Sequence, residues 1–193
     1  PHDFLKIEND MQFIVHAPEL FPNDHILDLT SGNNSYLNDS IQYANQVLDL
    51  TRKLKNFFPK CINPPVIFNI GGASDKSFLH KEKTLILEDN FFKSFKELNL
   101  SGIDFIPQTM PPFPWHFGGQ RYHNLMVEPA SIRRICNTLG LNICLDISHS
   151  ALACKFFNID LKDFIVEVSE FVRHLHIVDS KDIDGEALQL GEA

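Results

Sequence analysis

The sequence predicts one α/β domain, residues 1–193, built on a parallel sheet whose strand ends meet as in a barrel. Three observations predict this fold. Hydrophobic residues make up 44% of the 193, enough for one sizeable core. Short apolar runs alternate with longer segments of helical spacing, and polar residues gather toward the carboxyl ends of these runs. Strand, helix and strand in repetition indicate right-handed βαβ units.

The strand candidates are short segments rich in β-branched or aromatic residues, as expected for strands buried on both faces. They cover residues 13–16, 66–69, 103–108, 142–146 and 174–178. Apolar residues at helical spacing predict helices between and after them, over residues 41–54, 85–98, 129–139, 151–157 and 161–172. The irregular stretch at residues 107–121 is rich in proline and predicts a rigid loop, the kind of segment that usually carries function.

Local signals predict where these helices begin and end. Residues 38–40 form a plausible cap for the first helix, and Asp160 is expected to cap the last one, which extends to Val172. Pro129 suits the first turn of the third helix and Gly140 suits its end.

Charge and composition exclude several classes of protein. The net charge of -8 argues against a general nucleic-acid binder, which needs a cationic face. No apolar run reaches the roughly 18 to 20 residues of a membrane span. The four cysteines form no CxxC pair, so we expect free thiols in a reducing cytoplasm.

Polar side chains follow the predicted strands at their carboxyl ends. They are His16, Asn69, Gln108, Asp146 and His176. Side chains alternate between the two faces of a strand. If the apolar face meets the helices, these polar ends point together into the centre of the sheet. We therefore expect a functional pocket there.

The chemical types at these positions favour a divalent metal. His16, Asp146, His149 and His176 offer the imidazole and carboxylate groups that bind zinc, manganese and similar ions. Asp146 and His149 stand three residues apart, so both are able to reach one ion. The alternative is structural: a histidine at a strand end is commonly a hydrogen-bonded residue, and Asp146 suits the cap of the next helix.

Residues of the proline-rich loop have two readings as well. Trp115 and His116 either anchor the packed loop or form a wall over a polar ligand. Arg121 either projects into solvent or binds a charged substrate.

These residues carry a resemblance to a known family. The chain resembles the xylose isomerase-like TIM-barrel superfamily, which holds sugar-phosphate isomerases and epimerases together with endonuclease IV-type DNA repair enzymes. The matching segments are HAPE at 16–19, NIGG at 69–72, MPPFPW at 110–115, CLDISH at 144–149 and HLHIVD at 174–179. The stretch at residues 110–120 is similar to a branch of bacterial isomerase-like proteins.

The resemblance implies a (β/α)8 barrel with a divalent metal, Zn or Mn, at its carboxyl-end mouth. Asp146 and His176 match metal ligands of the isomerase branch, and His149 is a further ligand or proton carrier, as is His16. Gln108 stands where a Glu is expected. Because Gln is a neutral and weaker ligand, we expect weaker metal binding and weaker activity.

The implied reaction is isomerisation or epimerisation of a small sugar or sugar phosphate, by metal-assisted proton transfer next to a carbonyl. Asn69, Gln108, Trp115, His116 and Arg121 are the expected substrate-binding residues. Two alternatives stay open. One is an endonuclease IV-like phosphodiesterase acting on abasic DNA. The other is a non-catalytic sugar-binding barrel.

Length predicts a barrel that is incomplete at both ends. A full barrel needs about 250 residues and eight strands, whereas five strand candidates are visible here. Open sheet edges expose backbone and apolar surface. We therefore expect either marginal stability or assembly into a homo-oligomer.

Overall fold

The parallel strands lie side by side in the order of the sequence. The computed structural model describes residues 10–116 and 119–192. Its parallel strands are β1 (Val15–His16), β4 (Pro65–Phe68), β6 (Asp104–Pro107), β10 (Ile143–Asp146) and β11 (Val172–His176). β4 pairs with β1 and β6, and β10 pairs with β11. A parallel bridge from Gln108 to Cys144 joins the two groups. The expected parallel α/β architecture is confirmed.

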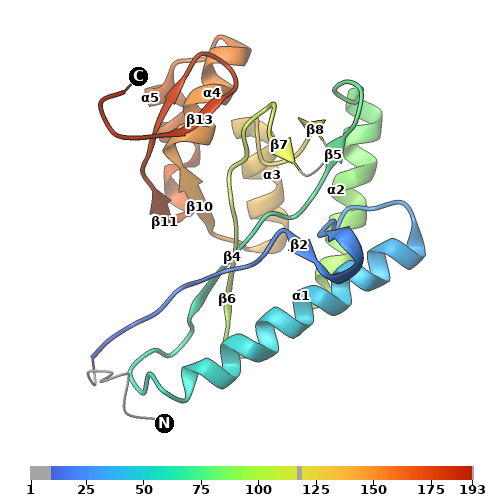
Figure 1. Ribbon diagram of the computed structural model, residues 1–193, viewed down its shortest axis with the longest axis vertical. Coiled ribbons are helices and arrows are strands. Elements are labelled where there is room, and N and C mark those ends of the chain that lie inside the picture. The colour runs from blue at the N-terminus through green and yellow to red at the C-terminus, as the bar shows by residue number, and fades with distance from the viewer. Residues whose placement is uncertain (1–9, 117–118, 193) are drawn as a thin grey trace.

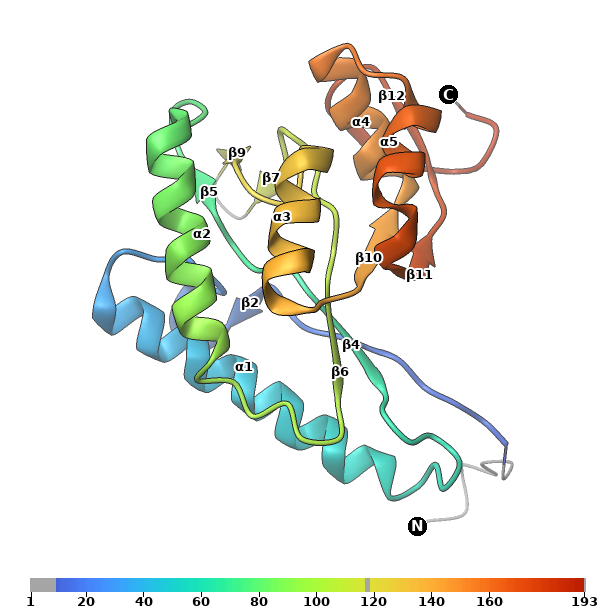
Figure 2. The same ribbon diagram turned by 180° about the vertical axis from the view of Figure 1, so that it is seen from behind.

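The helices form an outer layer along the strands. They are α1 (Asn34–Lys55), α2 (Lys81–Phe95), α3 (Pro129–Leu139), α4 (Ile147–Phe157) and α5 (Leu161–Val168), with the short 3-10 turns η1 (Pro22–Asp24) and η2 (Ser169–Phe171). Helices α1, α2 and α3 follow one another along β4 and β6, and α4 and α5 lie beside β10 and β11 (Figure 1, Figure 2). Among the described helices, none has the length and apolar character needed to cross a membrane.

The first helix begins earlier than its predicted cap at residues 38–40. Asn33 caps α1 instead, because its side-chain oxygen accepts hydrogen bonds from the backbone N–H groups of Ser35 and Tyr36. Ser40 lies inside the helix, where its buried hydroxyl contacts His25 Nε2 at 2.8 Å. Because α1 begins at Asn34 instead of residue 41, the helix is longer than predicted by about two turns at its start.

The later boundaries are partly as predicted. Helix α3 has Pro129 in its first turn and ends at Gly140, whose φ of 65° is left-handed. Asp160 caps α5, also as predicted. Helix α4 begins at Ile147 instead of residue 151, because Asp146 caps it directly. Val172 begins β11 and is not part of the last helix, so this strand covers residues 172–176 instead of 174–178.

The two faces of the parallel strands have different neighbours. The outward-facing side chains pack against the helices in one large core, which includes Val66, Phe68, Phe105, Ile143 and Leu145. The opposite face holds a small separate cluster of Ile67, Ile106 and Cys144. Strand register places the polar strand ends on this second face, as His16 aligns with Ile67 and Ile67 with Ile106. The polar residues therefore stand above an apolar floor inside the curve of the sheet.

Short hairpins and extended pairs follow the parallel strands. They are β2 (Leu20–Phe21) with β3 (His25–Ile26), β5 (Ala73–Ser74) with β9 (Tyr122–His123), β7 (Trp115–His116) with β8 (Gly119–Gln120), and β12 (Asp179–Lys181) with β13 (Gly185–Leu188). The predicted rigid loop at residues 107–121 thus contains a hairpin, which the Arg121 N–H secures by donating to the Pro114 carbonyl at 3.0 Å.

The outermost parallel strands leave apolar surface uncovered. Within the described residues, β1 and β11 each pair on one side only. Leu175 is 47% exposed and Ile177 is 58% exposed. This is the apolar surface on which the expected self-association depends.

Candidate active site

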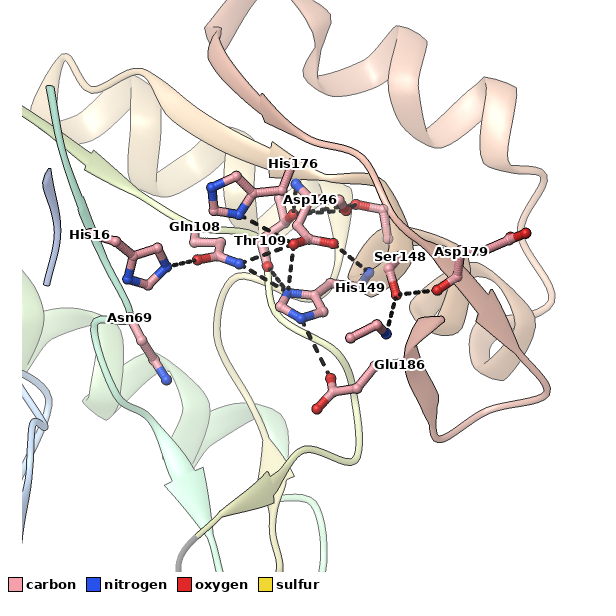
Figure 3. A network of polar contacts seen from close by, with 12 residues as sticks. His16, Asn69, Gln108, Thr109, Asp146, Ser148, His149, His176, Asp179 and Glu186 are labelled. Carbon is pink, nitrogen blue, oxygen red and sulfur yellow. Dashed lines mark hydrogen bonds and ion pairs between the residues drawn. The ribbon is translucent and has the colours of Figure 1, made fainter. Parts of the chain in front are cut away.

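The polar strand ends gather at one mouth of the curved sheet. His16 ends β1, Gln108 follows β6, and Asp146 and His176 are aligned at the ends of β10 and β11. The His16 and His176 rings stack with their centroids 5.6 Å apart. Figure 3 shows these side chains pointing toward one another. The structure therefore brings together four of the predicted strand-end residues in one cluster.

Asp146 combines a structural role with a central position in the cluster. Its carboxylate is almost fully buried, with 4% of the residue exposed. Oδ1 accepts a hydrogen bond from the His149 backbone N–H at 3.0 Å and so caps α4. Oδ2 faces the mouth, 3.4 Å from His176 Nδ1 and 3.7 Å from His149 Nδ1. Asp146 therefore caps the helix through Oδ1 and takes part in the polar cluster through Oδ2, so the two predicted roles are compatible.

The His149 side chain is held at both ring nitrogens. Nδ1 lies 2.8 Å from the Thr109 carbonyl, an acceptor, so we assign the proton to Nδ1. Nε2 lies 3.4 Å from Glu186 Oε2. Burial disfavours the charged imidazole, but the hydrogen bond to Glu186 and the charge of Asp146 outweigh burial and raise the pKa of His149. The protonated ring is therefore favoured relative to a free histidine.

His176 shows the opposite tendency. Burial lowers its pKa, and the nearby His16 and His174 add to this effect, whereas Asp146 opposes it. The ring is half-buried and meets Asp146 through Nδ1, which leaves Nε2 as an acceptor. Two imidazoles that share the Asp146 carboxylate thus differ in the direction of their pKa shifts.

Glu186 is a site residue that sequence reasoning missed. It belongs to β13, and the β12–β13 hairpin is fixed to α4 through Ser148. The Ser148 hydroxyl donates to the Asp179 carbonyl at 3.3 Å and accepts from the Ala187 N–H at 3.4 Å. The available signal was the Asp-Gly pair at residues 184–185, which is typical of a hairpin turn and so of a segment able to fold back over the mouth.

Asn69 follows β4 at the same mouth but turns away from the cluster (Figure 3). Its amide donates to Glu19 Oε1 at 3.2 Å and accepts from the Gly71 N–H at 3.0 Å. It lines a neighbouring pocket of about 210 Å³ together with Asp28, Tyr36 and Arg121, among others. Asn69 is thus a wall residue of this pocket, beside the cluster.

The loop residues have different positions. Arg121 lines the same pocket and forms an ion pair with Asp75. Trp115 lies on the β7–β8 hairpin and is 75% exposed. His116 is on the same strand, and its side chain lies outside the described part of the structure. Their roles in substrate binding stay predictions.

The donor set of the cluster does not fit a divalent ion. Across residues 10–116 and 119–192, no group of three or more His, Cys, Asp or Glu side chains is arranged to hold a metal. Asp146 Oδ2 and His176 Nδ1 form a pair, but the neighbouring Gln108 turns its amide nitrogen toward Asp146 at 3.2 Å. His149 Nδ1 donates to the Thr109 carbonyl and so offers no lone pair.

Comparison with known proteins identifies the fold. A family model described as xylose isomerase-like TIM barrel matches residues 5–192. A comparison with curated proteins gives no match. The solved structures that resemble the chain include a D-tagatose 3-epimerase-like protein, with a TM-score of 0.68 and 21% identity over 95% of this chain and 62% of that one.

Two further structures are similar. L-ribulose 3-epimerase gives a TM-score of 0.56 at 14% identity, covering 79% of this chain and 46% of that one. A protein from Thermus thermophilus, soaked with ZnCl2, gives 0.60 at 16% identity, covering 94% and 63%. The chain therefore spans less than two thirds of each of these three proteins, and the likeness establishes the fold.

Proposed function

This chain belongs to the xylose isomerase-like TIM-barrel family, and from that premise we propose that it acts on a small sugar or sugar phosphate by moving a proton next to a carbonyl, as an isomerase or epimerase. The observation that carries the proposal is the sharing of one buried carboxylate by two histidines: Asp146 Oδ2 lies 3.4 Å from His176 Nδ1 and 3.7 Å from His149 Nδ1. Sugar epimerases among the similar structures support the substrate class.

His176 is the proposed base. Its Nδ1–H donates to Asp146, which fixes the ring and leaves the Nε2 lone pair free. The lowered pKa keeps this ring neutral near pH 7 and able to accept a proton. Nε2 removes the proton from the carbon beside the carbonyl, and the C–H electron pair forms the double bond of an enediol.

His149 is the proposed acid. Glu186 and Asp146 favour its protonated form, and Nε2 carries the proton that is given to the carbonyl oxygen as negative charge develops there. Histidines with opposite pKa shifts in one site are the arrangement that separates an acid from a base. Return of a proton to the same or the neighbouring carbon completes epimerisation or isomerisation.

The remaining polar residues are proposed to bind the substrate. Gln108 and His16 contact each other at 3.0 Å at the centre of the mouth. Asn69 and Arg121 line the adjacent pocket. Trp115 and His116 are proposed to cover the ligand from the hairpin. We further propose that the protein works in the cytoplasm, which its four free, buried cysteines support.

The Zn or Mn ion expected from the sequence, with Asp146 and His176 as its first ligands, is not part of this proposal. Because the surrounding donors do not fit an ion, no proton-transfer step is assigned to it. The reaction is derived from the two histidines and the carboxylates beside them.

The test is exchange of substrate hydrogen with solvent. The chain is incubated in D2O with a panel of aldoses, ketoses and their phosphates, and NMR detects deuterium at the carbon beside the carbonyl. We expect His149→Gln and His176→Gln each to slow exchange by about 10²-fold or more. His80→Gln, at an exposed position where the His80 side chain makes no capping hydrogen bond, is the matched control.

Three results would contradict the proposal. Sugar binding without exchange would indicate the non-catalytic sugar-binding barrel. Cleavage of abasic DNA with no exchange on any sugar would indicate the phosphodiesterase. Exchange that both histidine variants retain at the rate of His80→Gln would place the chemistry elsewhere.

A further inference from the structure

Gln108 lies at the centre of the cluster and contacts a different group with each end of its amide. Oε1 lies 3.0 Å from His16 Nε2. Nε2 lies 3.2 Å from Asp146 Oδ2 and 3.3 Å from His149 Nδ1. The residue is 6% exposed. Since only the amide NH2 can donate to a carboxylate, these contacts orient the nitrogen toward Asp146 and the oxygen toward His16.

This orientation opposes cation binding at Asp146. An amide NH2 carries hydrogens and offers no free lone pair. Its hydrogens therefore lie on the Oδ2 side of Asp146, the side that also faces His176 and His149 (Figure 3). A cation approaching Oδ2 from the mouth would meet these hydrogens and the Nδ1–H of His149.

The carboxylate is nevertheless satisfied. Asp146 Oδ1 accepts from the His149 backbone N–H, and Oδ2 accepts from Gln108 with His176 Nδ1 close by. A buried carboxylate with hydrogen bonds on both oxygens does not require a metal ion to compensate its charge. Hydrogen bonds thus hold the Asp146 carboxylate in place, as a bound metal ion would otherwise do.

We propose that Gln108 is the residue that keeps divalent cations out of this centre, and that it positions Asp146 and His16 in their place. The same geometry predicts that one substitution at Gln108 turns the centre into a site that binds a divalent cation. Gln108→Glu replaces the NH2 by an oxygen beside Asp146 Oδ2, and His176 Nδ1 lies 3.4 Å from that oxygen of Asp146. Two carboxylates and an imidazole are ligands suited to Mn²⁺, and His176 Nδ1 becomes such a ligand when its proton moves to Nε2. The inference concerns cation binding and is independent of the substrate.

The experiment measures Mn²⁺ binding by the purified chain and by Gln108→Glu. Calorimetric titration gives the affinity, and elemental analysis after dialysis gives the stoichiometry. We expect Gln108→Glu to bind one ion per chain, on the order of 100-fold more tightly than the unsubstituted chain, because a new ligand has at least the effect of an outer-sphere partner. Asp146→Ala added to Gln108→Glu should abolish the gain.

Thermal unfolding supplies a second measurement. Without metal, Gln108→Glu places two carboxylates side by side in a buried site, so its Tm should fall. Added MnCl2 should raise the Tm of this variant and leave that of the unsubstituted chain unchanged, because binding to the folded state alone stabilises it. Gln120→Glu, which adds the same charge at an exposed position of β8, is the control and should show neither effect.

Two outcomes overturn the inference. One is an unsubstituted chain that binds Mn²⁺ as tightly as Gln108→Glu. The other is a Gln108→Glu protein that neither binds Mn²⁺ nor recovers its folded state when refolded with it.

Discussion

Replacing Asp146 separates its structural role from its role in the cluster. Asp146→Ala removes the cap of α4, which costs about 0.5–2 kcal/mol. It also removes the acceptor of the Gln108 amide, which lies 3.2 Å from Oδ2 in a buried site. A buried donor left without a partner costs about 1–3 kcal/mol more. We therefore expect a loss of roughly 1.5–5 kcal/mol in the free energy of unfolding, the sum of these two effects.

A second capping aspartate provides the matched control. Asp160 caps α5 by accepting hydrogen bonds from the backbone N–H groups of Lys162 and Asp163, at an exposed position. Asp160→Ala should cost only the capping term of about 0.5–2 kcal/mol. Asp146→Asn keeps a capping oxygen for α4 while it removes the charge beside His149, so this variant should retain most of the stability and lower the pKa of His149.

Urea unfolding monitored by circular dichroism measures the three free energies, and NMR titration of the imidazole signals measures the pKa. The reasoning is refuted if Asp146→Ala costs no more than Asp160→Ala, because Asp146 would then act as a helix cap alone. An unchanged His149 pKa in Asp146→Asn would show that the carboxylate and the ring are not coupled.

Other contacts in the structure lead to three more expected outcomes. Because the pKa of His149 is raised in the folded state, its protonation stabilises the folded chain fully below the unfolded pKa of 6.5, and this stabilisation is lost as pH rises through the folded pKa. His149→Gln should therefore lower the free energy of unfolding most at acidic pH. Urea unfolding at several pH values checks this, and a loss of stability that grows with pH contradicts it. The exposed Leu175 and Ile177 predict self-association, so sedimentation equilibrium should give multiples of 22.1 kDa. Leu175→Glu should then yield the monomer while Val166→Glu, on the exposed side of α5, does not; a monomeric unsubstituted chain would refute the argument. Trp115 is the one tryptophan, so a sugar that binds beneath the hairpin should change its fluorescence, and binding seen by calorimetry without such a change would exclude Trp115 as a wall of the site.

The strand cores and the cluster at their ends were predictable because both depend on short-range rules. An apolar run of four or five residues identifies a buried strand, and alternation of side chains then fixes which residues share a face. His16, Gln108, Asp146 and His176 met these conditions and lie together. Helix starts were less predictable, since Asn33 competed with residues 38–40 and Asp146 served as both strand end and cap.

The parts that were missed depend on loops, whose paths follow no period. Glu186 reaches His149 only because the β12–β13 hairpin folds back over α4. Asn69 met the same strand-end rule as Gln108, yet hydrogen bonds to Glu19 and Gly71 turn its amide into the neighbouring pocket. Tertiary contacts of this kind decide side-chain direction after the backbone has been placed.

Strand β10 passes into helix α4 with no connecting residue, since Asp146 ends one and Ile147 begins the other. The separation between Asp146 and His149 is consequently set by the first turn of α4, and an insertion there would break the cap and displace both side chains at once. Lengthening a hairpin such as β7–β8 changes only the loops around the mouth of the sheet and leaves Asp146 and His149 in place. Variation in ligand choice among chains of this architecture is therefore expected to accumulate in the hairpins, while the carboxylate and the imidazole beside it keep a fixed separation.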